Sequence, residues 1–172
     1  MQNIRRLKNR IITRLAACLP ALADRLIRAH MPLESQNVPW TPVGKPLAES
    51  KIALITTAGI HHRSQNPFDM ADPQGDPTFR ILDRDTIVSD YSITHDYYDH
   101  RDADRDLNIV LPIERLIEMQ TAGVIGAVAK THYSFMGHIM NSHVPDLVRI
   151  KAPEVAALLA ADRVDAVLLT PA

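Results

Sequence analysis

The chain has 172 residues, of which 46% are hydrophobic and 23% are charged, and this composition is typical of a globular protein of one ordinary domain, not of a disordered chain. No apolar run reaches the roughly 20 residues of a transmembrane helix, and Arg14 and Pro20 interrupt the only stretch that resembles a signal-peptide core, so we expect a cytoplasmic protein. Cys18 is the only cysteine, which excludes an internal disulfide and a cysteine-based zinc cluster.

The net charge of −1 conceals two parts of opposite sign. Residues 1–30 contain seven bases and one acid and carry a charge of +6, so the remaining chain carries −7. Eleven of the 20 acids are aspartates between Asp69 and Asp106. This density of negative charge disfavours binding to the phosphates of nucleic acid.

Residues 1–30 predict a basic amphipathic helical arm. Their leucines and isoleucines recur at steps of three or four, which places them on one stripe of a helix: Ile4, Leu7, Ile11, Leu15, Leu19, Leu22 and Leu26. Pro20 predicts a break after Leu19 and the start of a second short helix. We expect the arm to pack on its own domain or on a twin subunit, in preference to contact with a membrane surface. Residues 31–50, with four prolines and Trp40, predict an extended linker.

Residues 51–172 predict an α/β domain. In chain order, we expect strands at 52–57 and 86–94, a helix from Pro112 to Met119, a strand at 124–128, a helix from Pro153 to Ala161 and a strand at 164–169. Residues 61–85 predict a long polar loop. Because strands alternate with helices, the fold class is α/β, with a mostly parallel open sheet and flanking helices. The last strand brings Ala172 to the edge where such sheets place their sites, so we expect the N-terminal part of a larger fold.

The motif HDYYDH at residues 95–100 invites comparison with the HxHxDH zinc signature of the metallo-β-lactamase superfamily, in which the bound metal activates a water. Tyr97 stands where the second histidine should be, and a phenol is a poor zinc ligand at neutral pH. We therefore expect no metal here and keep a metal-dependent hydrolase that uses His95, Asp99 and His100 as an alternative.

Other familiar catalytic motifs are missing from the sequence. A serine lies near a histidine in HYSFMG, but no GxSxG elbow surrounds it, which disfavours a serine hydrolase. The chain has neither a dinucleotide fingerprint nor a GxxxxGK[ST] loop, so nucleotide binding is unsupported.

Several motifs, taken in order, resemble the selenoprotein B family, the substrate-activating component of glycine, sarcosine, betaine and D-proline reductases. They are WTP at 40–42, KPL at 45–47, KIALITTAGIH at 51–61, NPFDM at 66–70, GDPTFR at 75–80, ITHDYYDH at 93–100, DLNIVLPIERL at 106–116 and HYSFMG at 132–137. The resemblance covers roughly residues 38–172 and leaves the basic arm out.

The resemblance implies a selenocysteine, or a cysteine, directly after the strand that ends in AVLLTPA at residues 166–172. Since selenocysteine is encoded by UGA, we expect a chain interrupted at that codon and inactive by itself. The family implies that the selenolate, which is ionised at neutral pH where a thiol with a pKa near 8.5 is mostly protonated, attacks the carbon that bears an amino group. It also implies reductive cleavage of the C–N bond of a small amine or amino acid, partner subunits of a reductase complex, and a dithiol or thioredoxin-type reductant. We expect no cofactor other than this selenium, and homo-oligomerisation remains open.

The loops after the predicted strands supply the candidate site residues. We expect His61, His95, His132 and Tyr133 to supply protons or orient the substrate, because the loops that carry them meet at one end of the sheet. For the same reason we expect the substrate to contact Gly59, His61, Tyr98 and Ser134. The remaining alternative is a short non-catalytic binding protein.

Overall fold

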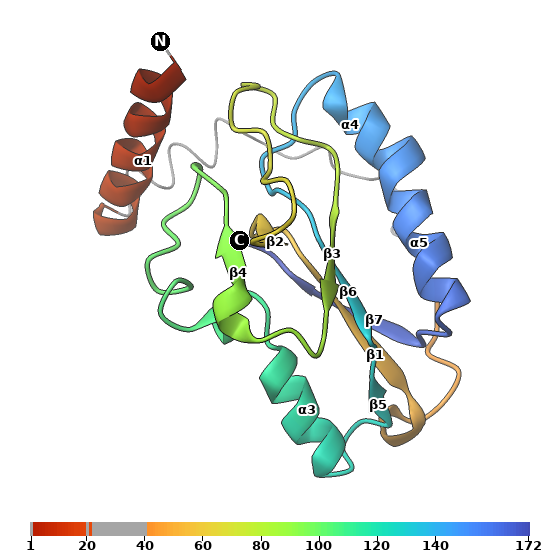
Figure 1. The fold of residues 1–172 in the computed structure, drawn as a ribbon. Helices are drawn as coiled ribbons and strands as arrows, with labels where there is room; N and C mark the ends of the chain where they lie inside the picture. Colours follow the sequence, from red (N-terminus) through yellow and green to blue (C-terminus); the bar gives the residue numbers. More distant parts are fainter. Residues whose placement is uncertain (1, 20, 22–40) are drawn as a thin grey trace. The chain divides into compact units, whose positions relative to one another are not determined.

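A computed structural model describes residues 2–19, 21 and 41–172, which divide into two compact units (Figure 1). One unit is Met1–Val43 with Asp96–Asp99, and the other is Gly44–His95 with His100–Ala172. The second unit contains the sheet and all the strands. Among the described residues, no helix combines the length and the apolar character that crossing a membrane requires.

The first unit contains the helix α1, Gln2–Cys18, in the arm where the sequence predicts a helix. Its isoleucines and leucines recur every three or four residues, so they share one side of the helix. The predicted break at Pro20, the second short helix and the linker residues up to Trp40 lie outside the described residues.

The sheet of the second unit is built around β1, Lys51–Thr56. On one side, β1 pairs in parallel with β7, Ala166–Thr170, along residues 52–56. On its other side it pairs in parallel with β5, Ala127–Val128, and then with β6, Thr131–Ser134. The fifth strand, β3 at Arg80–Asp83, is antiparallel to β6. The predicted α/β fold with a mostly parallel open sheet is therefore confirmed, with one antiparallel strand added.

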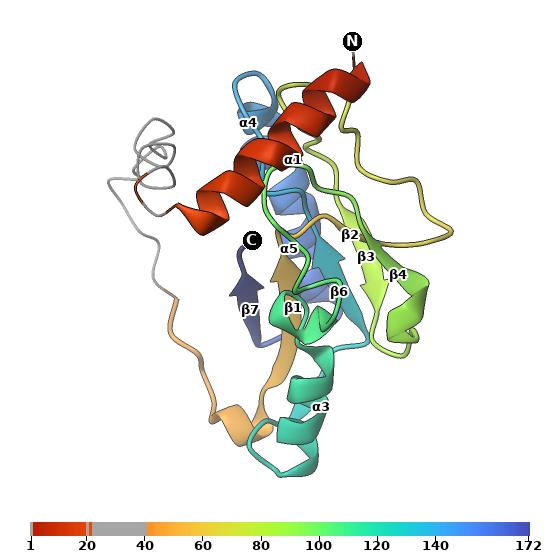
Figure 2. The same ribbon diagram turned by 90° about the vertical axis from the view of Figure 1, so that its left-hand side faces the viewer.

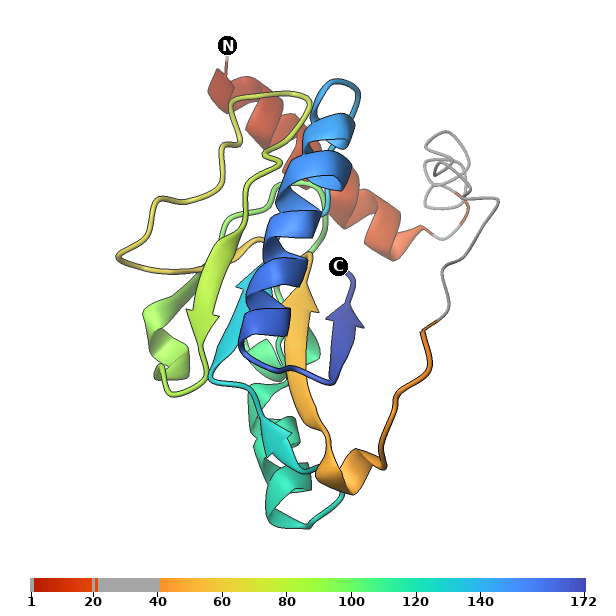
Figure 3. The same cartoon turned by 90° about the vertical axis from the view of Figure 1, so that its right-hand side faces the viewer.

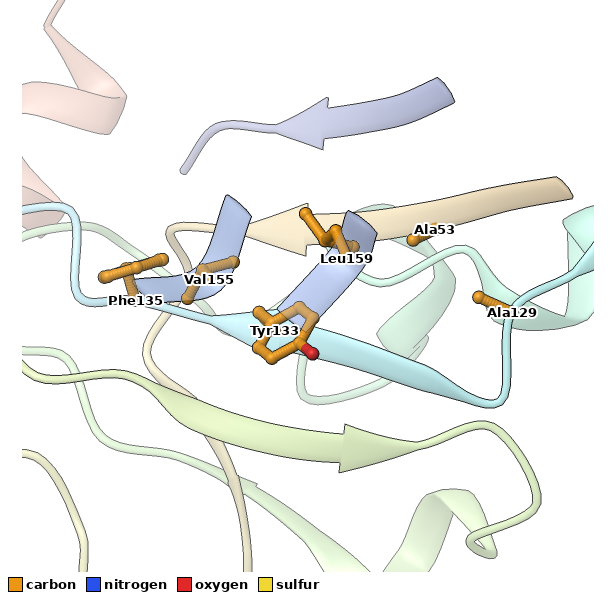
Figure 4. Close-up of a cluster of buried hydrophobic side chains, with 6 residues drawn as sticks. All are labelled: Ala53, Ala129, Tyr133, Phe135, Val155 and Leu159. Atoms are coloured by element: carbon orange, nitrogen blue, oxygen red, sulfur yellow. The ribbon is translucent and has the colours of Figure 1, made fainter. Parts of the chain in front are cut away.

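One face of this sheet is covered by a long helical segment (Figure 3). It begins as α4, His143–Asp146, passes through a π-helical stretch at Leu147–Lys151 and continues as α5, Ala152–Ala161. Val155 and Leu159 of α5 pack on Ala53, Tyr133 and Phe135 of the sheet (Figure 4). The helix predicted from Pro153 is thus present, but the helical segment begins ten residues earlier.

The remaining elements are shorter. Pro112 caps α3, Ile113–Thr121, so the helix predicted from Pro112 to Met119 is present, and Gly123 follows the C-terminal cap residue Ala122 with a φ of +71°. A two-stranded antiparallel sheet pairs β2, Ile60–His62, with β4, Tyr91–Ile93. Three 3₁₀ turns occur at Leu47–Glu49, Val88–Asp90 and Leu107–Ile109.

Two strand predictions were too long and three strands were missed. The strand expected at 86–94 shrinks to Tyr91–Ile93, and the one at 124–128 shrinks to Ala127–Val128. The missed strands are β2, β3 and β6, which fall in segments that the sequence analysis took as loops. Each has only three or four residues, too few for an alternating pattern, and buried polar side chains such as His132 and Ser134 hide the apolar character of β6.

Asp76 organises the long segment between β2 and β3. Its carboxylate accepts hydrogen bonds from the backbone N–H of Asp69 and from both the N–H and the hydroxyl of Thr78, and Arg80 lies 3.4 Å away. Burial alone would raise the pKa of Asp76, but these hydrogen bonds and the charge of Arg80 together hold the pKa below its ordinary value. The guanidinium of Arg80 also stacks 4.2 Å from the ring centre of Phe68. This segment is therefore a hydrogen-bonded structure that leads the chain into β3.

Candidate functional site

The carboxyl ends of the three parallel strands β1, β6 and β7 meet at one edge of the sheet, and Figure 2 shows their arrowheads pointing the same way. Just beyond these ends the backbone stays hydrogen-bonded from strand to strand. The N–H of Thr57 donates to the carbonyl oxygen of Thr170 at 3.2 Å, and the N–H of Ala172 donates to Oγ1 of Thr57 at 3.0 Å. The last residues of β7 are thus fixed beside the end of β1, at the edge where open α/β sheets bind their ligands.

Gly137 lies in the middle of this edge. A Cβ atom added there would lie 3.0 Å from the carbonyl oxygen of Ala172, 3.2 Å from that of Thr57 and 3.3 Å from Nε2 of His95. These distances are shorter than an ordinary van der Waals contact, so only glycine fits without moving its neighbours. Gly137 therefore allows the segments after β1, β6 and β7 to approach one another closely.

His95 is joined to this edge through its ring. The N–H of Gly137 donates to Nε2 of His95 at 3.2 Å. A ring nitrogen that accepts a hydrogen bond carries no proton, so in the neutral form of His95 the proton is on Nδ1. His95 is buried, with 4% of its surface exposed. Of the histidines predicted to assist the chemistry, it is the one in hydrogen-bond contact with Gly137.

Gly59 and His61 form the connection that leads from β1 into the two-stranded sheet. Gly59 has a φ of +71°, and a Cβ there would lie 2.6 Å from the carbonyl oxygen of Thr94. Nδ1 of His61 lies 2.9 Å from the carbonyl oxygen of His62, and Nε2 lies 2.9 Å from Oγ1 of Thr94. Since a carbonyl only accepts, Nδ1 of His61 is the donor and Nε2 accepts from the Thr94 hydroxyl. Both ring nitrogens of His61 are thereby occupied: Nδ1 bonds within β2, and Nε2 joins β2 to Thr94, the residue that follows β4.

His132, Tyr133 and Ser134 are part of β6 and not of a loop. Tyr133 belongs to the core beneath α5 (Figure 4), and burial raises the pKa of its hydroxyl. Successive side chains of a strand point to opposite faces, so His132 and Ser134 share the other face, where both are fully buried.

His132 fills the gap that opens in the sheet between β5 and β6. The N–H of Leu54 in β1 has no strand partner there and donates to Nδ1 of His132 at 3.0 Å. Burial, and to a lesser degree the charge of Arg84, lowers the pKa of His132 to about 4, so the ring is neutral at physiological pH. With Nδ1 as acceptor, the proton is on Nε2, which has no hydrogen-bond partner among the described residues.

The segment HDYYDH is divided between the two units, since Asp96–Asp99 belong to the first unit and His95 and His100 to the second. Nδ1 of His100 lies 2.7 Å from Oδ2 of Asp104, four residues along the chain. Tyr98 and Asp99 lie in the first unit, and no contact of theirs tests the predicted roles. Across residues 2–19, 21 and 41–172, no group of three His, Cys, Asp or Glu side chains is arranged to hold a metal ion.

The sequence analysis missed Thr57 and Gly137. Thr57 directly follows β1 and Gly137 lies three residues beyond β6, and a glycine shortly after a strand is the signal that could have identified Gly137. Which of the predicted residues touch a substrate stays a prediction.

The family model for glycine/sarcosine/betaine reductase selenoprotein B matches residues 17–172 of the chain. The chain belongs to this family. The resemblance of its motifs is therefore confirmed, and the match takes in every strand of the sheet as well as Thr57, His95 and Gly137.

Curated relatives carry names from the same group of enzymes. The D-proline reductase subunit gamma of Acetoanaerobium sticklandii is 36% identical over 131 residues, which are 76% of this chain and 52% of the relative. The glycine reductase complex component B subunit gamma of Symbiobacterium thermophilum is 32% identical over 137 residues, 78% of this chain and 31% of the relative. The sarcosine reductase complex component B subunit beta of Peptoclostridium acidaminophilum is 26% identical over 103 residues, 59% of this chain and 24% of the relative. No solved structure matches the chain.

The chain spans about half of the D-proline reductase subunit and about a third of the glycine reductase subunit that it matches. The similarity of this selenoprotein B family chain is therefore to one part of each relative and not to its whole length.

Proposed function

We propose that the complete protein is the substrate-activating component of a selenium-dependent reductase, which cleaves the C–N bond of a small amine or amino acid such as glycine, sarcosine, betaine or D-proline. Its reactive selenocysteine, or a cysteine in its place, follows Ala172 directly. The enzyme works in the cytoplasm with partner subunits and a dithiol reductant. The family match over residues 17–172 and the reductase names of the relatives support this proposal.

The observation that carries the proposal is the arrangement at the end of β7. Ala172 is held by Thr57, and its carbonyl oxygen lies beside Gly137, whose N–H is bonded to His95. A residue attached to that carbonyl begins at the carboxyl edge of the sheet. This is where an α/β enzyme places reacting groups, and the close packing at Gly137 gives the attached residue a fixed starting point.

The proposed chemistry needs a nucleophile and a source of two electrons. The selenolate forms a Se–C bond as the C–N bond breaks, and the amine leaves with the electron pair of that bond and takes up a proton. Breaking the Se–C bond then requires two electrons, which a dithiol supplies as it becomes a disulfide. A selenolate suits the first step because it is ionised at neutral pH without the help that a thiol would need.

In this proposal the residues of the described chain position the reacting groups. His95 fixes the N–H of Gly137, and Gly59 with His61 shapes the connection that follows β1 at the same edge. We keep Tyr98 and Ser134 as substrate contacts, and His132 and Tyr133 as assisting residues, as predictions from the sequence.

The proposal is tested first on the gene. The codon after that of Ala172 should be UGA or a cysteine codon, followed by an open frame that encodes further α/β sequence. The complete protein should then be made with selenocysteine and assayed, together with its partner subunits and a dithiol, on glycine, sarcosine, betaine and D-proline.

We expect C–N cleavage of at least one of these substrates, detected as a released amine for glycine, sarcosine and betaine and as a ring-opened amino acid for D-proline, and loss of that cleavage when serine replaces the selenocysteine. His95→Gln should lower kcat while the protein stays folded, whereas Ile87→Gln, at an exposed isoleucine outside the site, serves as a control. A frame that closes within a few codons, or a complete protein that cleaves the C–N bond of none of the four substrates, would refute the proposal.

A further inference from the structure

The apolar side of α1 is exposed. Ile4, Leu7, Ile11 and Leu15 lie on one stripe of the helix, and between 48% and 72% of each side chain is accessible. Four large aliphatic side chains at this spacing are normally buried against another surface. The described residues of the unit that contains α1 do not cover the stripe, so within this unit α1 presents an apolar surface that a partner can bind.

The unit that contains α1 uses the opposite side of the helix for its own contact. Arg6 lies about 200° around the helix from Ile4, since each residue turns the helix by about 100°. Nε of Arg6 donates to Oδ2 of Asp96 at 2.5 Å, and a second guanidinium nitrogen lies 3.4 Å from Oδ1. The ion pair with Asp96 thus engages the polar side of α1 and leaves the apolar stripe facing away from that contact.

The charge of α1 points to an anionic partner. The helix has five bases and no acid: Arg5, Arg6, Lys8, Arg10 and Arg14. On a helical projection, Arg10 and Arg14 border the apolar stripe on one side, and Lys8 and, farther round, Arg5 lie on the other. Long basic side chains can extend their charged ends toward phosphate groups while their methylene stems stay beside apolar surface.

We propose that α1 lies in the surface of an anionic lipid bilayer, with its apolar stripe among the acyl chains and the adjoining bases Lys8, Arg10 and Arg14 at the lipid phosphates. An exposed apolar stripe flanked by bases is the pattern of helices that bind in the plane of a membrane surface. With 17 residues, α1 is about 25 Å long, which gives room for all four aliphatic side chains to insert side by side.

Two other partners fit this helix less well. A second α1 packed through its stripe would bring Lys8, Arg10 and Arg14 of one helix close to the same bases of the other, and α1 has no acid to neutralise them. Nucleic acid would satisfy the bases, but it would leave the apolar stripe exposed. Of these three partners, the anionic membrane surface is the one that satisfies both the apolar stripe and the bases beside it; the sequence analysis had placed it second.

Membrane binding by α1 would be a property added to the reductase body. The family match begins at residue 17, so nearly all of α1 lies outside the region that the family shares. The inference does not depend on the proposed reductase activity, and each can fail without the other.

The test is co-sedimentation of the full-length protein with vesicles. One set contains phosphatidylcholine with about a third phosphatidylglycerol, and the other contains phosphatidylcholine alone. We expect at least tenfold tighter binding to the anionic vesicles, and a loss of most of that binding when salt is raised to molar concentration, because salt screens the attraction. The double variant Leu7→Asp/Ile11→Asp should lose binding by more than tenfold. The matched control Ile87→Asp changes an equally exposed isoleucine in the other unit and should bind like the parent protein.

Three outcomes would overturn the proposal. The first is equal binding of the parent protein and the double variant to anionic vesicles. The second is a dimer in sedimentation velocity that the double variant abolishes, without vesicle binding by either protein, since the stripe would then be a protein interface. The third is salt-dependent binding to duplex DNA that exceeds binding to anionic vesicles. Helical content measured by circular dichroism for each variant separates a lost surface from a lost helix.

Discussion

His132 should make the stability of this protein depend on pH in a way that a single substitution can remove. The ring is fully buried and accepts the N–H of Leu54, and burial lowers its pKa from 6.5 to about 4. In the unfolded chain the ring binds a proton below about pH 6.5, whereas in the folded protein it resists protonation until about pH 4. The unfolded state therefore binds more protons between these values, and the free energy of unfolding falls as the pH is lowered through this window.

The size of this effect follows from the shift in pKa. One pKa unit corresponds to about 1.4 kcal/mol, so the contribution of His132 to the loss of stability between pH 7 and pH 4 should be about 3 kcal/mol. Above the pKa that His132 has in the unfolded chain, near 6.5, this loss of stability is absent. It is nearly complete at the pKa of the folded protein, about 4.

The assay is urea unfolding at a series of pH values from 7 to 4 for the parent protein and for His132→Asn. The amide oxygen of asparagine can replace Nδ1 as the acceptor for Leu54, but the side chain does not titrate. We expect a lower free energy of unfolding for the variant at pH 7, because its side chain is smaller, and a weaker dependence on pH by about 3 kcal/mol over the range. Ser134→Ala, on the same buried face, is the control that can change stability but not its pH dependence. An equal pH dependence in the parent protein and His132→Asn would refute the reasoning.

Three further predictions concern other parts of the described chain. Gly137→Ala should lower the free energy of unfolding by about 1–3 kcal/mol, measured by urea unfolding, because its Cβ would press on the carbonyl oxygens of Thr57 and Ala172; unchanged stability would contradict the packing at this edge. Asp76→Asn should cost about 1–3 kcal/mol at pH 7 and less as the pH falls through the folded pKa of Asp76, since that pKa is lowered and the stabilisation belongs to the carboxylate; a loss independent of pH would show that charge plays no part. Leu168→Lys on β7, whose outer edge has no strand partner among the described residues, should weaken self-association of the 172-residue chain in sedimentation velocity, and a parent chain that is already monomeric at high concentration would contradict an adhesive edge.

Local signals in the sequence were reliable where an element is long or carries its own end signals. The strand at residues 52–57 is a continuous apolar run and was predicted within one residue. Pro112 and Gly123 define the ends of α3 through the fixed φ of proline and the positive φ that glycine tolerates, and these preferences act within the segment itself.

The sequence alone could not identify β3 and β6. Both have four residues, and β6 buries His132 and Ser134 where a pattern of alternating apolar residues would be expected. The ring of His132 fits there because it accepts the N–H of Leu54, which has no strand partner in the gap between β5 and β6. That gap forms only when β1 has paired with both strands.

The candidate site divides in the same way. The order of short motifs along the chain was enough to identify the family, because such motifs are local, and the sequence also identified His95 and Gly59 as residues of interest. The sequence could not show that His61 bonds to Thr94 beside β4, or that Tyr133 packs in the core under α5. Both contacts depend on which elements pack against the strand that carries the residue.

By itself, then, the sequence determined the α/β class, the ends of the longer elements, the basic amphipathic character of α1 and the family. Periodicity, proline and glycine preferences and charge are properties of neighbouring residues, so they can be read along the chain. Only the tertiary structure decided that Thr57, Gly137 and Ala172 meet beside His95, and that Arg6 engages Asp96 from the side of α1 opposite the apolar stripe. These contacts join residues between 35 and 115 positions apart, and the distances between such residues are set by strand pairing and packing rather than by any local preference.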